Sequence, residues 1–345
     1  MKTVRQLVRL FAATQLLPVL ESGEETLVGG QAVLEGVMMR SPHAWGIAVR
    51  RANGELATHS EPLDRPSEKH GWMGWPIVRG CITLGHAMQL GYRAMRYSAN
   101  IALAEAQDGP EEEKVEFKGW LATANTILSI AFFIAFYKFL PLITARAIQH
   151  RAHLGIMSMN LIDGGIRILL FLGFLYALSR MRDIHRVFEF HGAEHKTVFA
   201  FEDRSATAAS AQDDGGRIAI EEAQRYVTWH PRCGTSFLMT VMLISLGVYT
   251  FITAHHFWLQ FLIRIALLPV IAGVSYELIR FAGKLSKRRS QTDASKLFKL
   301  LTLPGLWLQR ITTQPPSDDQ VECAIVALDH AMQLERQRGG ELVLA

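Results

Sequence analysis

The sequence predicts a mainly α-helical membrane protein, in which a four-helix transmembrane bundle carries a small α+β cytoplasmic domain. Four apolar segments, 120–145, 155–178, 236–254 and 257–279, are each long enough to cross the hydrocarbon core of a bilayer, which takes about 20 helical residues. Ahead of them, residues 28–60 carry strand and hairpin signals. With 49% hydrophobic and 20% charged residues, the 345-residue chain is apolar for a soluble protein.

Residues 1–118 form the first predicted unit, a cytoplasmic N-terminal region with a β-hairpin domain and an amphipathic helix. Residues 1–20 resemble either a signal peptide or an amphipathic surface helix. Gln15 and Pro18 interrupt their apolar patch and no clean cleavage site follows, which favours the surface helix.

The β part of this region is predicted at 28–60. Residues 28–40 have the composition of a strand, and two further strands flank Asn53-Gly54, a strong hairpin signal. Glu35 interrupts the apolar run of the first strand. It is either an edge charge with a partner, which we favour, or a group aimed at an active site.

A loop and a helix complete the N-terminal region. Trp72 and Trp75 lie in the Pro- and Gly-rich loop 61–76, where they suit a membrane interface or the edge of a soluble core. Apolar positions recur at helical spacing over 77–97, which predicts a helix lying on the membrane or on the bundle. The acidic stretch 105–118 reads as a solvated linker.

Transmembrane helices 1–2 are predicted within 119–181 and helices 3–4 within 236–281. Charged residues inside a membrane face the bundle interior, form pairs or reach toward the interface. Asp163 and Arg167 are four residues apart on a helix and should pair. The other charges in the segments are Lys138, Arg264 and Glu277.

Basic residues near the spans predict the orientation. Arginines and lysines follow the second and fourth segments, whereas the connections at 146–154 and 255–256 are short. By the positive-inside rule, both termini and the loop 182–235 are cytoplasmic, and the protein is a multi-pass protein of the cytoplasmic (inner) membrane.

Composition limits the classes of partner. The net charge of +4 suits contact with anionic lipid, so we expect the lipid bilayer as a partner. No basic and aromatic stripe indicates nucleic acid. Three cysteines without framework spacing argue against a disulfide scaffold. Oligomeric state stays open.

The cytoplasmic loop 182–235 carries the candidate metal motifs. His191 and His195 are four residues apart, so on a helix both imidazoles could bind one ion. Glu194 would then lie where a base could take a proton from a water on the metal. This is the inverted form of the zinc-protease motif. His230 and Cys233 form a second pair with ligand spacing, and both pairs enter at the same membrane face.

The number of ligands decides the type of site. Four ligands would close a zinc shell and make it structural, whereas three leave a position for water and permit catalysis. Cys233 favours zinc, with iron as the alternative, over magnesium. Inverted zinc proteases take a distant glutamate as third ligand, and neither Glu277 nor Glu221 is obviously placed for it. His185 and Glu202 are further alternative ligands or supporting groups.

Residues 282–345 form a cytoplasmic tail. A short amphipathic helix is expected at 290–300, and 303–308 has an interfacial composition. Ser317 and Gln320 form a capping box that starts a helix over 318–334, which should dock on the N-terminal domain.

Together, the motifs GGQAVLEGVMMR (29–40), FHGAEHKT (190–197), HPRCGTSF (230–237), AGVSYE (272–277) and the Pro304–Thr313 stretch resemble a widespread, uncharacterised family of bacterial membrane proteins. Its members are often labelled predicted metal-dependent enzymes. The resemblance covers roughly 25–330. It implies a bacterial source and a membrane location, and it names no substrate.

Three functions remain open. The first is a metal-dependent hydrolase at the cytoplasmic membrane face, with Glu194 as base and a peptide or lipid headgroup as substrate. The second is a non-enzymatic scaffold held by a structural metal or by hydrogen bonds among the His and Cys side chains. The third and weakest is a transporter or lipid carrier using Asp163, Arg167 and Arg264.

Overall fold

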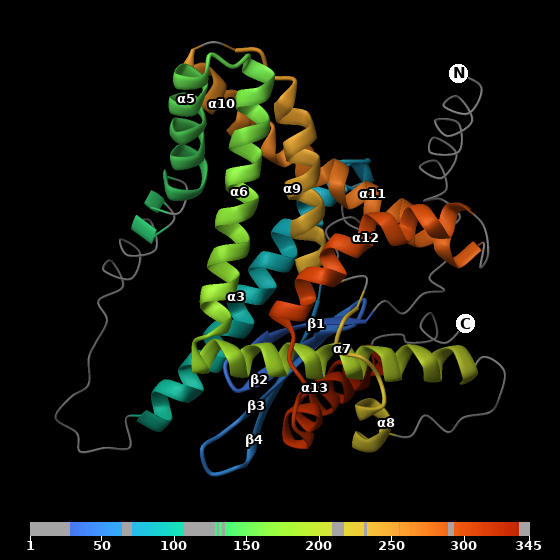
Figure 1. Ribbon diagram of the computed structural model, residues 1–345. Helices are drawn as coiled ribbons and strands as arrows, with labels where there is room; N and C mark the ends of the chain where they lie inside the picture. Colours follow the sequence, from blue (N-terminus) through green and yellow to red (C-terminus); the bar gives the residue numbers. More distant parts are fainter. Residues whose placement is uncertain are drawn as a thin grey trace.

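A computed structural model describes residues 28–63, 71–106, 128–129, 131–132, 135–208, 217–230, 233–254, 256–288 and 293–337. In Figure 1 a body of long helices stands above a small sheet, and helix α7 (Arg182–Ala208) lies across the junction between them. The predicted segment 1–20, most of the acidic linker and residues 120–127, 130 and 133–134 of the first span lie outside the described residues.

The sheet has four antiparallel strands in the order β1-β2-β3-β4: Gly29–Val33, Gly36–Arg40, Ala44–Arg50 and Leu56–Pro62. The hairpin at Asn53-Gly54 is confirmed, with Gly54 at φ 87°. The single strand expected over 28–40 is wrong. The chain turns at Leu34 and Glu35, where Glu35 takes the left-handed conformation at φ 53° and pairs with Arg186.

Both faces of the sheet are covered by helices. Helix α13 (Asp318–Gln337) and α7 pack on one face, and α3 (Val78–Ala106) packs on the other. This explains why β2 and β3 read as unbroken apolar runs rather than as alternating ones. A Cβ on Gly46 would lie 2.5 Å from the carbonyl oxygen of Ala327, so glycine lets α13 approach closely. The predicted docking of the C-terminal helix on the N-terminal domain is confirmed.

The helical body consists of a π-helical turn, η4 (Ala135–Phe139), and six α-helices. The α-helices are α5 (Leu140–Ala152), α6 (Ile156–Ser179), α9 (Gly234–Thr250), α10 (Phe257–Ala266), α11 (Leu268–Arg288) and α12 (Asp293–Thr312). Helix α9 packs on α6, α11 and α12, and α11 also packs on α3.

Two helical stretches in the described part of the chain are long and apolar enough to cross a membrane. They are α6 and the α10–α11 stretch Phe257–Arg280, whereas α9 is a shorter apolar helix. The predicted mainly helical character is therefore confirmed. The four-helix transmembrane bundle stays a prediction, because the two candidate spans meet the requirements of length and composition alone. The fourth predicted segment has a break at Leu267, which divides it into α10 and α11.

A network of buried charges joins α6 to α10. The predicted pair forms, with Arg167 Nη2 2.8 Å from an oxygen of Asp163. Arg264 adds a second ion pair to the same carboxylate and donates to Asn160 Oδ1 at 2.6 Å. One aspartate thus neutralises part of the charge of two arginines inside the body.

Two helices extend beyond their predicted ends. Helix α3 continues to Ala106, past the predicted end at 97. The short helix expected at 290–300 is wrong, because α12 runs on to Thr312 through Pro304. A Cβ on Gly305 would lie 2.5 Å from the backbone of Ser236, so α12 lies tightly against α9. This packing offsets the hydrogen bond that Pro304 removes.

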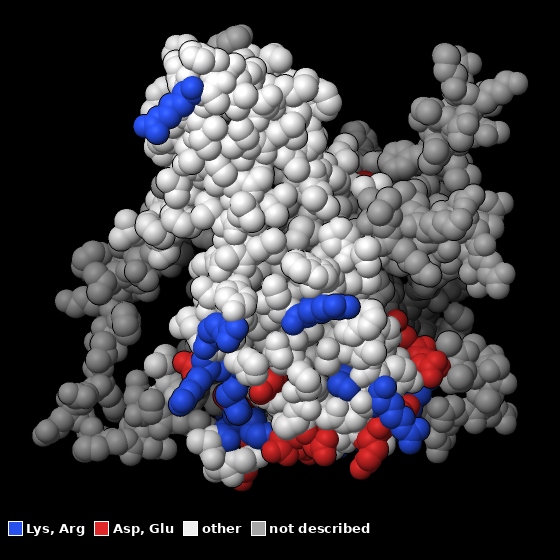
Figure 2. Space-filling view, in the orientation of Figure 1, with Lys and Arg blue, Asp and Glu red and all other residues white. Residues whose placement is uncertain are grey.

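The surface divides into two regions. On the face in Figure 2, charged side chains gather over the sheet and its covering helices, while the helical body above is almost uncharged. Trp72 and Trp75 are largely exposed, so in this structure they do not cap a core. Large apolar side chains are exposed along α6, α9, α10 and α11: Leu161, Leu169, Phe174, Leu238, Leu243, Trp258, Leu259, Leu262, Val270 and Val274.

Candidate metal centre

The His-x-x-Glu-His motif lies in the middle of helix α7, as its spacing predicts. One turn separates His191 from His195, and their ring centroids are 4.5 Å apart. Apolar neighbours on other faces of the helix, Phe190, Ala193 and Val198, are buried in the core beneath the sheet. The helix is therefore anchored by packing while its two imidazoles face the same side.

Cys233 reaches the imidazoles from the start of α9. It is the N-cap residue of that helix, and its sulfur accepts from the backbone N–H of Thr235. Its Sγ lies 3.2 Å from His191 Nε2. One ligand atom each from His191, His195 and Cys233 lies within 4.8 Å of the other two. Two segments separated by about 40 residues thus converge on one point.

Backbone carbonyls determine which imidazole nitrogens carry protons. His191 Nδ1 lies 2.8 Å from Thr312 O, and His195 Nδ1 lies 2.5 Å from Thr228 O. A carbonyl oxygen only accepts hydrogen bonds, so each Nδ1 must donate and each neutral imidazole keeps its lone pair on Nε2. This is the arrangement that orients histidine ligands in metal sites.

His195 Nε2 is buried, and no hydrogen-bond partner for it occurs among the residues that the structure describes. A buried polar atom without a partner carries a free-energy cost of about 1–3 kcal/mol. A metal ion on this lone pair would remove that cost.

Glu194 lies against both histidines. Its Oε2 is 3.4 Å from His195 Nε2 and 4.0 Å from His191 Nε2, and its side chain is 8% exposed. Strand β1 passes over it, since a Cβ on Gly30 would lie 2.7 Å from Glu194 Cγ. Gly30 therefore leaves room for the Glu194 side chain.

His230 lies beside the three grouped residues rather than among them. Its ring centroid is 5.8 Å from that of His195, and the ring packs edge-on against Phe199 at 4.5 Å. Its Nε2 is 3.7 Å from a Glu202 oxygen. Burial lowers the pKa of His230, although the charge of Glu194 opposes this. Three of the four predicted ligands thus converge.

The other candidate acids lie elsewhere. Both oxygens of the Glu35 carboxylate accept hydrogen bonds from the Arg186 guanidinium. Of the two interpretations of Glu35, the structure therefore shows the charge with a partner. Glu277 is buried and pairs with Arg79, with one bond of 2.6 Å. Glu221 is an exposed residue of α8 (Ile220–Gln224), and His185 lies 3.6 Å from Glu189.

Gly192 has a packing role that its sequence position does not reveal. A Cβ there would lie 2.1 Å from the carbonyl oxygen of Gln314. The Gln314 N–H also donates to Phe188 O at 2.9 Å, so the chain after α12 runs directly along α7. Glycine thus lets Thr312 O come within reach of His191.

Sequence reasoning missed the groups that hold the ligands in place. Gln309 accepts from the His230 N–H at 2.6 Å and donates to His230 O at 2.9 Å and to Ser236 Oγ at 2.8 Å. Thr228 and Thr312 act through carbonyl oxygens, which every residue has. Gln309 and Thr312 both lie in the Pro304–Thr313 motif, which was the one signal in the sequence that pointed to these groups.

Comparison with known proteins places the chain among bacterial relatives. A family model described as "Protein of unknown function (DUF1385)" matches residues 75–334. The chain belongs to this family. It is also similar to "Uncharacterized protein YqhQ" of Bacillus subtilis (strain 168), with 30% identity over 317 residues, which cover 89% of this chain and 92% of that protein. No solved structure matches the chain. The resemblance to an uncharacterised bacterial family is confirmed, and the descriptions of these relatives assign neither a metal nor a reaction.

Proposed function

We propose that this protein is a multi-pass membrane protein that binds a zinc ion through His191, His195 and Cys233 and hydrolyses a peptide or a lipid headgroup at the cytoplasmic membrane face. The observation that carries the proposal is the buried Nε2 of His195, which makes no hydrogen bond within the described residues and lies close to His191 and Cys233 Sγ.

The donor set fits zinc. Imidazole nitrogen suits zinc, copper, iron and nickel, and a thiolate excludes magnesium and calcium as natural occupants. Three protein ligands are typical of catalytic zinc sites, because the fourth position stays open to water or substrate. His230 lies outside the group of three ligand atoms, and its Nε2 is 3.7 Å from a Glu202 oxygen, so we do not count it among the ligands. Iron is the alternative metal.

Glu194 is the proposed general base. A zinc ion bound here would make water acidic enough to ionise near neutral pH. The Glu194 carboxylate, 3.4 Å from His195 Nε2, is within reach of a water at that point and can take its proton. The hydrogen bonds to Thr228 O and Thr312 O keep the proton of each imidazole on Nδ1, so both Nε2 atoms stay available to a metal.

Exposed apolar surface supports the membrane placement. Only 17% of the apolar window of α6 and 22% of that of Phe257–Arg280 is buried within the protein. Exposing so many large apolar side chains to water is unfavourable, whereas a bilayer would cover them. We therefore propose four spans, formed by 120–145, α6, α9 and the α10–α11 stretch. Arg180, at the end of α6, and Arg182 and Arg186, at the start of α7, favour a cytoplasmic metal centre and cytoplasmic termini.

A structural metal is the second candidate. The centre connects α7, the segment before α9 and the end of α12, so a metal here would also tie three segments together. In that case the double variant His191→Ala/His195→Ala should unfold at a clearly lower temperature, and no turnover would depend on Glu194.

Metal content is the first test. Elemental analysis of detergent-purified protein should find about one zinc ion per chain, which His191→Ala/His195→Ala should lose. His230→Ala should keep the metal, because its ring lies beside the ligand set. Wild-type protein without zinc or iron, even after zinc is added back, would refute the hydrolase.

Cobalt substitution tests the ligand set. A cobalt-loaded wild-type protein should show a sulfur-to-cobalt charge-transfer band, and Cys233→Ser should remove it. Glu194→Gln should retain both metal and band while losing turnover of peptide or phospholipid substrates. Full turnover in Glu194→Gln would exclude this carboxylate as the base.

A further inference from the structure

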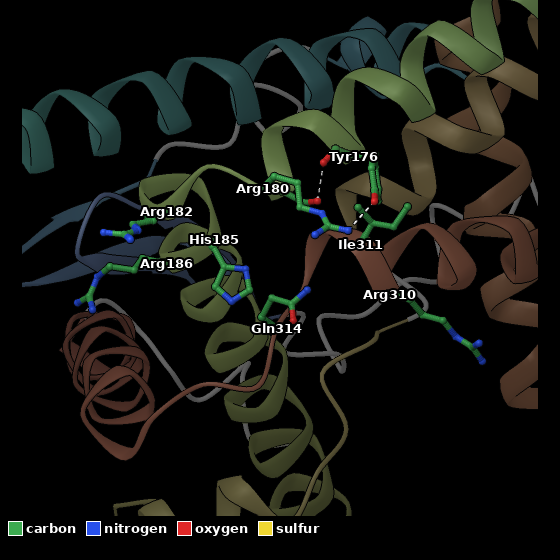
Figure 3. Close-up of a pocket in the computed structure, with 9 residues that line it drawn as sticks. Tyr176, Arg180, Arg182, His185, Arg186, Arg310, Ile311 and Gln314 are labelled. Atoms are coloured by element: carbon green, nitrogen blue, oxygen red, sulfur yellow. Dashed lines mark hydrogen bonds between the residues drawn. The ribbon is translucent and has the colours of Figure 1, made fainter.

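An open pocket of about 610 Å³ lies where α6 meets α7, beside the end of α12. It is lined by Tyr176, Ser179, Arg180, Arg182, His185, Arg186, Arg310, Ile311 and Gln314. In Figure 3, Arg180, His185 and Gln314 surround its centre, with Arg182 and Arg186 to one side and Arg310 to the other. The pocket is separate from the metal centre, although both use the chain after α12, through Gln314 and Thr312 respectively.

The charged residues of the lining are basic. Four of its nine residues are arginines and none is an Asp or Glu. Arg186 is paired with Glu35, and His185 lies 3.6 Å from Glu189. Asp183, in the first turn of α7, is exposed and does not line the pocket.

The other three arginines lack a carboxylate partner. Within the described residues, none of Arg180, Arg182 and Arg310 forms an ion pair, and Arg180 instead stacks on the ring of Tyr176 at 4.8 Å. The residues that line the pocket therefore include three arginines whose charge no described carboxylate neutralises.

We propose that this pocket binds a phosphate group that carries negative charge. Arginine guanidinium groups bind phosphate oxygens through paired, charge-assisted hydrogen bonds, and the Tyr176 hydroxyl adds a neutral group. Helix α7 also begins at Arg182. The first backbone N–H groups of a helix have no partner within the helix, so they favour an anion.

The position of the pocket indicates how such a phosphate would arrive. It lies at the lower end of α6, where the uncharged surface of the helical body gives way to charged side chains. In a membrane this boundary is the depth of lipid headgroups, so an anionic phospholipid meets the pocket without leaving the bilayer. A free phosphate from the cytoplasm carries the same chemistry, and the experiment separates the two sources.

Binding is measured on the full-length, detergent-purified protein with three probes: dihexanoyl-phosphatidylglycerol, dihexanoyl-phosphatidylcholine and inorganic phosphate. The test variant is Arg180→Gln/Arg182→Gln, which removes two of the arginines without a carboxylate partner. The control variant is Arg225→Gln/Arg336→Gln, which removes the same charge from exposed positions that do not line the pocket. Thermal unfolding and monodispersity confirm that both variants are folded.

The test variant should bind phosphatidylglycerol at least about tenfold more weakly than wild type, while the control stays within about twofold. Phosphatidylcholine, which has no net charge, should bind more weakly than phosphatidylglycerol. Inorganic phosphate could instead bind tightly to wild type and more weakly to the test variant. That result would identify a soluble phosphate as the ligand and would also support phosphate binding in this pocket.

No binding of any probe, or equal loss in both variants, would overturn the proposal. The inference does not depend on the zinc site, because the arginine variants should keep the metal content of the wild type.

Discussion

Replacing Gly192 by alanine tests the packing that positions both histidines. The new Cβ would lie 2.1 Å from the carbonyl oxygen of Gln314 and 3.2 Å from Thr228 Cγ2. Ordinary Cβ contacts begin at 3.4 Å, so α7 and the chain after α12 must separate by roughly 1 Å. That chain carries Thr312 O, the acceptor of the His191 Nδ1–H.

Two opposing effects determine the change in stability. Crowding a packed interior costs about 1–3 kcal/mol, and alanine favours a helix over glycine by about 1 kcal/mol. We therefore expect a net loss of up to about 2 kcal/mol. Disturbing a hydrogen bond to a ligating imidazole lowers metal affinity by about 10–100-fold, so metal affinity should respond more clearly than stability.

Gly85→Ala provides the matched control. Gly85 is an exposed glycine of helix α3, and a Cβ there would meet no atom within 4 Å. That variant should gain up to about 1 kcal/mol and keep its metal affinity. Thermal unfolding in detergent and competition with a zinc chelator would measure both quantities. If Gly192→Ala matches Gly85→Ala in both, α7 does not lie against Gln314 as described.

Two further predictions concern buried charges away from the candidate metal centre. Asp163→Ala should lower the free energy of unfolding, measured in detergent, by about 3–5 kcal/mol, because it leaves Arg167 and Arg264 buried without their carboxylate. A loss below about 1 kcal/mol would contradict this and show that water reaches the charged network. Burial alone would raise the pKa of Glu335, but hydrogen bonds from Ser41 and from His43 lower it. The stability that this carboxylate contributes is therefore complete above its unfolded pKa of about 4.3 and is lost as pH falls through the lower native pKa. Between about pH 5 and pH 3 the unfolding temperature of Glu335→Gln should therefore fall less than that of the wild type. An equal fall in the two proteins would contradict this.

Local signals predicted much of the fold because they depend on neighbours in sequence. Helix α13 begins at the predicted capping box, and the hairpin turns at Asn53-Gly54. The turn at Leu34 and Glu35 gave no such signal, because neither residue is typical of a left-handed position. The pair between Glu35 and Arg186, 151 residues apart, accompanies that turn.

The candidate centre shows the same division. The spacing of His191 and His195 placed both rings on one face of a helix, since helical geometry alone brings positions four apart together. Their meeting with Cys233 was an expectation from topology, and the structure brings that residue to 3.2 Å from His191. His230 was predicted as a fourth ligand because it lies three residues before Cys233. That spacing does not determine where the imidazole ring packs.

The sequence by itself determined the apolar helical segments, the hairpin, the start and amphipathic face of the last helix and the ligand-type residues of α7. These follow from periodicity and turn chemistry, which act over a few residues. Only the tertiary structure decided that β1 and β2 are separate strands, that α12 passes through Pro304, and that three rather than four candidate ligands converge. Each of these depends on contacts between segments far apart in the chain, where a glycine such as Gly192 or Gly305 allows an approach that local preference cannot show.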